Sequence, residues 1–198
     1  MSSSEHGPLP RFTAAHVWLV LDILARAAGP LGRAALATAA GIGEGSMRTI
    51  LELLRKKRFV SIRRAGIMLT NSGRRFVAGA PLTVLDIDAG DATVDEHDVA
   101  VLVRGGADRV TDGMKQRDDA IKAGASGATT IVNRDGRLLI PPDTALRAAQ
   151  PALTERLANM LRPGDMVVIG TGPTRAAAAL GALAAALVFA ACGKFYRF

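Results

Sequence analysis

The stretch that decides the fold is LGRAALATAAGIGEGSMRTILELLRKKRFVSIRRAGIMLTNSGRRF, from Leu31 to Phe76. We expect a short helix over Arg33–Ala40, because Gly41 can adopt the left-handed conformation that ends many helices. A second helix is expected over Ser46–Lys57, with the Ser46 hydroxyl as its N-cap. Along it the apolar residues recur at i, i+3, i+4 and i+7 and form one stripe: Met47, Ile50, Leu51 and Leu54. The pattern predicts a helix-turn-helix.

A β-hairpin is expected directly after the second helix. Phe59–Ile62 reads as one strand and Ile67–Leu69 as the return, with Arg63–Gly66 as the tip. Another helix is expected to start within Thr70–Phe76. Two helices followed by such a hairpin predict a winged helix-turn-helix.

The polar face of the second helix and the hairpin tip carry groups that suit DNA. A helix with an apolar back and a basic, hydrogen-bonding front fits a major groove. Arginines at a hairpin tip can reach phosphates or a minor groove. The candidate DNA-binding residues are Ser46, Arg48, Thr49, Arg55, Lys56, Arg63 and Arg64.

The charge distribution supports a DNA partner for the first part of the chain. Residues 1–80 carry 12 Lys and Arg against 4 Asp and Glu, a net charge of +8, whereas residues 81–198 carry 13 against 14. The formal net charge of +7 therefore comes from the part that contains the helix-turn-helix. A concentrated positive charge favours binding to DNA through counterion release.

The run GIGEGSMRTILELLRKKRFV, together with LTNSGRRF, resembles the winged-helix DNA-binding domain of many archaeal and bacterial transcription regulators. The resemblance implies that the helix over Ser46–Lys57 enters the major groove of double-stranded DNA. It also implies that the hairpin over Phe59–Leu69 is the wing. Some winged helices bind only protein, and the sequence leaves that alternative open.

We expect two domains of different class, joined near Ala78–Pro81. Residues 1–12 read as a disordered arm, and 13–80 as the winged helix-turn-helix, whose first helix is expected over Ala14–Ala27. Trp18 on that helix suits either a domain or subunit contact or ordinary core. Residues 81–198 alternate strand and helix signals, which predicts an α/β domain. Strands are expected over 82–87, 99–103, 129–132, 137–140 and 166–169, and helices over 112–123, 151–161 and 175–191.

One candidate ligand site lies on the helix expected to end near Ala123. Met114 and Ile121 should mark its buried face, which brings Gln116, Arg117 and Asp118 close to a pocket with the hydroxyls of Thr129 and Thr130. Charged side chains at such positions are costly to bury unless they meet each other or a ligand. The alternative is a solvated helix whose i,i+4 pairs, Lys115 with Asp119 and Asp118 with Lys122, only stabilise it.

A second candidate site is the segment Gly170-Thr-Gly-Pro-Thr174, between a strand and a helix. Helix N-termini and the carboxyl ends of strands in open α/β sheets bind anions. The proposed phosphate or carboxylate cradle uses Gly170, Thr171, Gly172 and Thr174. The segment resembles the Gly-Thr-Gly-Ser-Thr phosphate turn of sugar-phosphate isomerases and of sugar-sensing bacterial repressors. A plain tight turn is the alternative.

Residues 81–198 as a whole resemble an uncharacterised C-terminal domain that follows winged helices in predicted archaeal regulators. The resemblance rests on GMKQRDDAIKAGASGATTIV and on the late strand, turn and alanine-rich helix. It implies an architecture of a DNA-binding head with an α/β companion, and it implies no functional residues.

The sequence gives no support for catalysis, a metal or a cofactor. The histidines His6, His16 and His97 are scattered, and Cys192 lies alone in an alanine-rich run, where packing is its expected role. The acidic stretch between Asp86 and Asp98 matches no calcium loop, so a solvated loop is expected. The 17 uncharged residues from Ala176 to Cys192 include ten alanines and read as a buried helix rather than a membrane span. With no secretory signal in the N-terminal sequence, we expect a soluble, cytoplasmic protein that does not bind membranes.

These patterns predict a DNA-binding transcription regulator that is not an enzyme. It should act as a homodimer, because one short recognition helix reads few bases. The second domain should bind a small anionic metabolite, form the dimer contact, or do both. The alternatives are an enzyme acting on a phosphorylated metabolite and an interaction module that does not bind DNA.

Overall fold

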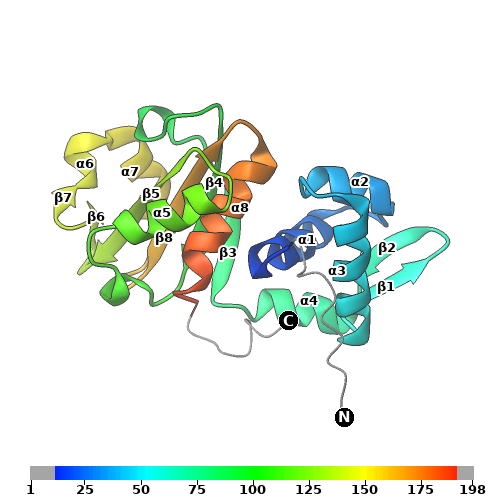
Figure 1. Ribbon diagram of the computed structural model, residues 1–198. Helices are drawn as coiled ribbons and strands as arrows, with labels where there is room; N and C mark the ends of the chain where they lie inside the picture. Colours follow the sequence, from blue (N-terminus) through cyan, green and yellow to red (C-terminus); the bar gives the residue numbers. More distant parts are fainter. Residues whose placement is uncertain (1–11, 191–198) are drawn as a thin grey trace, which may run out of the picture.

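The computed structural model describes residues 12–190 and shows two parts side by side (Figure 1). The first, which we call the head, holds four helices and a two-stranded hairpin. The second, which we call the body, is a six-stranded sheet with helices on both faces. Residues 1–11 of the expected arm over 1–12 lie outside the described residues, and so does Cys192.

The head is a winged helix-turn-helix, as the sequence predicts. Its helices and strands are α1 (Ala14–Arg26), α2 (Arg33–Ala39), α3 (Glu44–Lys56), β1 (Val60–Arg63), β2 (Gly66–Leu69) and α4 (Asn71–Ala78). The predicted N-cap at Ser46 is wrong: α3 begins two residues earlier and its N-cap is Gly43. Thr70 caps α4 by accepting a hydrogen bond from the Gly73 amide at 3.0 Å.

The wing is fastened to the rest of the head by backbone and side-chain contacts. Leu31 and Ile67 exchange two backbone hydrogen bonds, at 2.9 and 2.8 Å, so the segment before α2 lies along β2. Phe59, just before β1, stacks on Phe76 of α4 with ring centroids 4.4 Å apart. The hairpin therefore has a fixed direction relative to α3.

The body is built on one antiparallel sheet. Its strand order is β3-β4-β8-β5-β6-β7, and every neighbouring pair is antiparallel. The strands are β3 (Leu82–Asp86), β4 (His97–Val103), β5 (Gly127–Arg134), β6 (Arg137–Ile140), β7 (Thr144–Ala145) and β8 (Met166–Gly172). A hairpin turn at Asn133–Gly136 joins β5 to β6. The expected domain boundary at Ala78–Pro81 coincides with the link from α4 to β3.

Helices cover both faces of this sheet. On one face lie α5 (Met114–Lys122) and α8 (Arg175–Leu187), and on the other lie α6 (Leu146–Ala149) and α7 (Pro151–Ala158). Two 3-10 turns, Gly90–Ala92 and Ala107–Arg109, interrupt the connections. Along β4, Val99, Val101 and Val103 face α8 whereas Ala100 and Leu102 face α6 and α7. Burial on both faces explains why the β4 and β8 segments read as continuous apolar runs.

The helix α8 lies unusually close to the sheet because small residues meet at the contact. A Cβ atom added to Gly170 on β8 would lie 2.3 Å from the Ala178 carbonyl oxygen. A Cβ on Gly172 of the same strand would lie 3.1 Å from the Ala177 Cβ, and a Cβ on Gly181 would lie 2.4 Å from the Ala125 Cβ, just after α5. The alanine-rich sequence of α8 is therefore a packing surface, although the helix ends at Leu187 rather than near Ala191 as expected.

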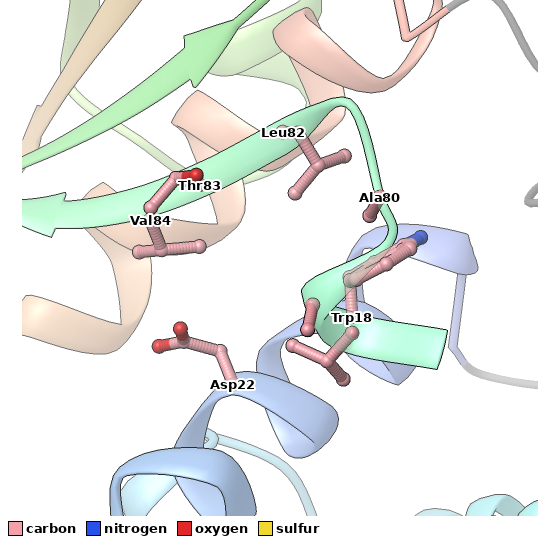
Figure 2. A pocket seen from close by; sticks show the side chains of 8 residues that line it. Trp18, Asp22, Ala80, Leu82, Thr83 and Val84 are labelled. Carbon is pink, nitrogen blue, oxygen red and sulfur yellow. The ribbon is translucent and has the colours of Figure 1, made fainter. Parts of the chain in front are cut away.

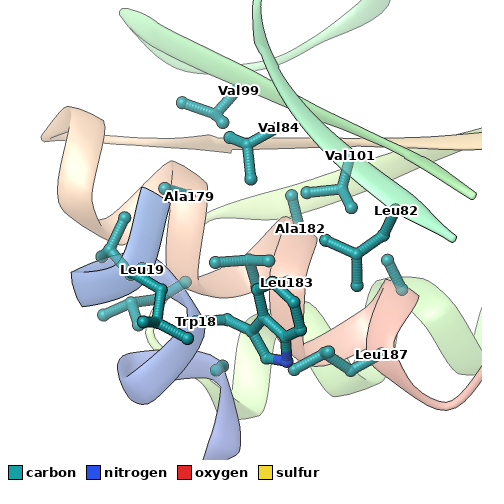
Figure 3. Close-up of a cluster of buried hydrophobic side chains, with 14 of the residues drawn as sticks. Trp18, Leu19, Leu82, Val84, Val99, Val101, Ala179, Ala182, Leu183 and Leu187 are labelled. Atoms are coloured by element: carbon teal, nitrogen blue, oxygen red, sulfur yellow. The ribbon is translucent and has the colours of Figure 1, made fainter. Parts of the chain in front are cut away.

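The first helix of the head joins the two parts. Its residues Val17 to Leu21 are all buried, so α1 is apolar around its circumference. It packs on α8 as well as on α2, α4 and β2, and one hydrophobic core runs from the head into the body. Figure 3 shows Trp18 and Leu19 of α1 facing Leu183 and Leu187 of α8. Trp18 thus lies in the core and at the domain contact, and both of the sequence interpretations hold.

Polar groups complete this junction. Arg26 at the end of α1 binds Asp22 one turn earlier (Nε–Oδ2 2.9 Å) and Asp86 at the end of β3 (Nη1–Oδ2 2.7 Å). It also donates to the Val84 carbonyl oxygen on the edge strand. Arg175 of α8 binds the same Asp86 carboxylate at 2.5 Å.

A cavity of about 180 Å³ remains between α1, the end of α4 and β3. In Figure 2 the Asp22 carboxyl points from α1 towards Val84, and Trp18 lies beside Ala80. Burial at this junction raises the pKa of Asp22 above its ordinary value, and the attraction of Arg26 opposes that effect only in part. No helix within residues 12–190 is long and apolar enough to cross a membrane.

We predict that Gly170→Ala lowers the free energy of unfolding by about 1–3 kcal/mol, because its methyl group would meet the α8 backbone. Urea denaturation monitored by circular dichroism measures this. Gly45→Ala is the control: a Cβ there meets nothing within 4 Å, and alanine suits a helix interior better than glycine. Equal stability of Gly170→Ala and the wild type would contradict the tight contact.

We also predict that Asp22→Asn becomes more stable relative to the wild type as the pH rises. An acid whose pKa is raised by folding contributes stability below its unfolded pKa, 3.8 here, and loses that contribution as pH rises through the folded pKa. Asparagine does not ionise, so the variant does not lose stability in this way as the pH rises. The difference in unfolding free energy, variant minus wild type, should therefore rise between about pH 3.5 and pH 7.

Asp86→Asn is the matched control with the opposite sign. Partial burial alone would raise the pKa of Asp86, but hydrogen bonds and charge from Arg175 and Arg26 lower it overall. Its carboxylate stabilises the fold above the unfolded pKa, so Asp86→Asn should become less stable relative to the wild type as the pH rises. A flat profile for Asp22→Asn would mean that Arg26 fully compensates the burial of Asp22.

Candidate nucleic-acid interface and effector region

The helix α3 presents the face that the sequence predicts. Its apolar stripe is buried, with Met47, Ile50 and Leu54 fully enclosed. Arg48, Thr49, Arg55 and Lys56 are exposed on the opposite side, and Ser46 is half-buried. Since the apolar stripe holds the helix against the head, the polar face is held in a fixed orientation towards solvent.

The wing adds two further cations. Arg63 ends β1 and Arg64 follows it in the turn, and both are exposed. The neighbouring Ile62 is 48% exposed, an apolar side chain on the same strand. In Figure 1 the wing and α3 lie on the side of the head away from the body, with α1 between them and the sheet. The body therefore does not cover this face.

A groove of about 240 Å³ runs between α3 and the wing. Arg33, Arg48 and Arg55 line it together with Glu52, Leu51, Ile62 and Ile67. Arg33 of α2 also pairs with Glu44 at the start of α3, with Nη2–Oε2 3.3 Å. Sequence reasoning did not name Arg33 and Glu52 among the candidate residues, and both line this groove. Glu52 was visible on the polar face of α3, whereas the approach of Arg33 to this groove depends on how α2 packs.

The helix α5 presents a different face from the one expected. Met114 and Ile121, expected to be buried, are 52% and 43% exposed. The buried residues are Gln116 and Ala120, one turn apart, because α5 packs on the small residues of α8 through Ala120 and Gly181. Arg117 and Asp118 are exposed and do not point into a pocket. The prediction for these two side chains is wrong, and Lys115–Asp119 at 2.5 Å shows the solvated, ion-paired alternative.

The two threonines of β5 lie on a strand and therefore alternate between the faces of the sheet. Thr129 donates a hydrogen bond to the Ala92 carbonyl oxygen at 2.8 Å. Thr130 is 4% exposed, and its hydroxyl has no hydrogen-bond partner within residues 12–190. Gln116 and Thr130 are buried whereas Arg117 and Asp118 are exposed, so these side chains do not share one environment as expected.

The expected anion cradle is part of a strand rather than a turn. Gly170, Thr171 and Gly172 belong to β8 and pair with β4 on one side, and β5 on the other. Thr171 is 2% exposed, and its hydroxyl accepts a hydrogen bond from the Asp95 amide at 3.1 Å. Thr174 caps α8 through the Ala177 amide. The hydroxyls of Thr171 and Thr174 therefore already accept hydrogen bonds within the body. The expectation that ligands bind at the carboxyl ends of strands holds for parallel sheets, whereas this sheet is antiparallel.

The acidic stretch is tied to the body by local contacts. Asp98 accepts hydrogen bonds from the Ala89 amide and the Thr93 hydroxyl, each at 3.0 Å, and Asp88 pairs with Arg156. A hydrogen bond from the Ser126 hydroxyl lowers the pKa of Asp95 below its ordinary value. Within the described residues, no three His, Cys, Asp or Glu side chains gather as a metal site would require.

His16 has a structural position at the start of α1. Its Nδ1 lies 3.1 Å from the Thr13 amide, so it closes the first turn of the helix. Partial burial there lowers its pKa below the ordinary value. Neither its neighbours nor its place in the fold suggests chemistry.

The two parts of the chain match two family descriptions. Residues 20–81 match the CggR N-terminal DNA binding domain, and residues 94–189 match a domain of unknown function, DUF4443. The solved structure of hypothetical protein PH0730 from Pyrococcus horikoshii OT3 is similar over 90% of this chain and 92% of that one, with 26% identity and a TM-score of 0.70. No curated protein matches the chain. The first part of the chain is thus similar to a CggR-type N-terminal DNA-binding domain and the second to DUF4443, and the whole chain is similar in fold to the Pyrococcus protein.

Proposed function

We propose that the protein is a transcription regulator that binds double-stranded DNA through its head. The observation that carries the proposal is the face formed by α3 and the wing, where the apolar stripe is buried and the cations are exposed. The similarity of residues 20–81 to a DNA-binding domain supports it independently. The body leaves that face accessible in Figure 1.

In the proposed complex, α3 lies in the major groove. Ser46, Arg48 and Thr49 are on its N-terminal half, from which winged helices and related motifs contact base edges. Arg55 and Lys56 at the C-terminal end, with Arg63 and Arg64 on the wing, contact phosphates. A bidentate arginine on guanine is the commonest specific contact of this kind, so Arg48 is the residue to which we assign readout.

We further propose that the protein binds DNA as a homodimer whose body carries the dimer contact or senses a small molecule, or does both. One head places only a few side chains in the groove, and a second head raises both affinity and specificity. The extended core between α1 and α8 supports a sensing role, because a change in the body reaches the head through packed side chains.

We predict that Arg48→Ala weakens binding to the specific site by about 1–3 kcal/mol, the discrimination supplied by one bidentate base contact. Selection from genomic fragments at about 0.15 M salt recovers that site, and fluorescence anisotropy measures the affinities. Arg147→Ala is the matched control, since Arg147 is an exposed arginine of the body. A site bound equally by both variants, or no recovered site, would exclude this docking mode.

We predict a different effect for the wing. Replacing Arg63 and Arg64 together by alanine should weaken binding to all sequences about equally, because phosphate contacts carry no base information. The slope of log K against log salt should become shallower by about 2, close to 0.9 for each lost phosphate contact. A loss confined to the specific site would instead assign the wing to base readout.

A further inference from the structure

A cleft lies between the head and the N-terminal end of α8, and Thr174 is the one lining residue that the sequence analysis proposed for a ligand site. Its volume is about 620 Å³, within the range of small-molecule sites. The head contributes Asp22 and Arg26 of α1, Thr38 of α2, and Gly41, and the body contributes Thr174 and Arg175. Segments more than 130 residues apart in the sequence thus form its two walls.

We propose that this cleft binds a small organic oxyanion, a carboxylate or phosphate on an apolar body, and that this ligand is the effector of the regulator. The effector part rests on the proposed DNA-binding function, whereas the binding of the oxyanion does not. The proposal follows from the donors, the charge and the apolar surface of the cleft, taken in turn below.

The two guanidinium groups retain free hydrogen-bond donors. A guanidinium has five N–H groups. Arg26 uses three of them, on Asp22, Asp86 and the Val84 carbonyl, and Arg175 uses two, both on Asp86. Five of the ten N–H groups therefore have no partner within residues 12–190. Planar, paired donors of this kind match the geometry of carboxylate and phosphate oxygens.

The charge of the lining favours an anion. It holds two arginines and one carboxylate, Asp22, which is 9% exposed and already bound to Arg26. Asp86, the other counter-ion of both arginines, is not part of the lining and its side chain is 60% exposed. A ligand oxyanion can replace it at the guanidinium groups, because an exposed carboxylate gains little from such pairs and is readily solvated.

The rest of the cleft suits an apolar body. Ile23, Ala27, Leu31 and Ala39 line the side of the head, and Ala176 lines the side of the body. A ligand with only an oxyanion, such as inorganic phosphate, would leave this surface in contact with water. The combination of apolar walls with a few convergent polar groups is typical of metabolite sites.

Occupancy of the cleft would act on the recognition helix. A Cβ atom at Gly41, where φ is +66°, would lie 3.1 Å from the Ala176 Cβ, so the turn of the helix-turn-helix rests on α8. α3 begins at Glu44, three residues later. A ligand between Thr38 and Arg175 contacts the segment that leads directly into α3, and any change in head position that it favours changes DNA affinity by the same coupling free energy.

The test uses a panel of small aromatic and aliphatic carboxylates and phosphate monoesters, each paired with its neutral amide or alcohol. Each is added at about 1 mM to the full chain without DNA, and backbone amide resonances are recorded by NMR. We expect at least one anion to shift the amides of Thr38, Gly41 and Ala176 while its neutral counterpart does not. Arg175→Gln should weaken its binding about ten-fold or more, and Arg156→Gln, an exposed arginine elsewhere, should not.

Ala39→Glu provides a second test if Arg175→Gln does not fold. Ala39 is an exposed residue of α2 that lines the cleft, so glutamate there adds a negative charge, and Ala39→Gln controls for its size. Binding should be lost with glutamate and kept with glutamine. No shifted amide with any panel member, equal shifts from neutral counterparts, or unchanged binding to Ala39→Glu would each overturn the oxyanion site.

The effector role has its own readout. The binding anion is added to the DNA titration of the wild-type protein, and the DNA affinity should change by about five-fold or more, in the range of allosteric couplings. An unchanged affinity for a bound site would overturn the effector assignment alone. If no DNA is bound at all, the regulator proposal fails while the NMR result on the cleft still stands.

Discussion

The burial of α1 on all sides is the constraint on which the rest of the molecule depends. Val17 to Leu21 put apolar side chains around the whole helix, so it is stable only between two partners. One is the remainder of the winged helix and the other is α8 of the body. The head is therefore packed against the body rather than joined to it only by a flexible linker. Removing the body would expose a large apolar surface of α1 to water.

The position of α8 follows from the same requirement. Gly170 and Gly172 on β8 let the helix approach the sheet closely, and α8 also packs on α1. The N-terminal end of α8, where Thr174 and Arg175 lie, is thereby brought against the turn of the helix-turn-helix. Arg26 and Arg175 share Asp86 across this contact and fix its polar edge. The winged-helix head and the interdomain cleft are thus linked through two packed helices, α1 and α8.

The outcome of the sequence predictions depends on the range of the interactions involved. The winged helix and the solvent-exposed face of α3 were predictable, because the period of Met47, Ile50 and Leu54 reports which side of one helix is buried. The buried face of α5 was not predictable. Met114 and Ile121 also have helical spacing, and only packing on the small residues of α8 decides that Gln116 and Ala120 face inward instead. Likewise, glycines such as Gly170 and Gly172 occur both in ligand-binding turns and in strands packed closely against a helix. The sequence alone does not distinguish the two.

The sequence by itself determined the winged helix, the strands of the body and the location of positive charge. These follow from local periodicity, turn residues and composition, which involve residues close in the chain. Tertiary structure alone decided that the sheet is antiparallel, that α1 is shared between the parts, and that Arg26 meets Arg175 at one cleft. Such contacts join segments distant in sequence, and their geometry depends on the packing of whole helices rather than on any local pattern.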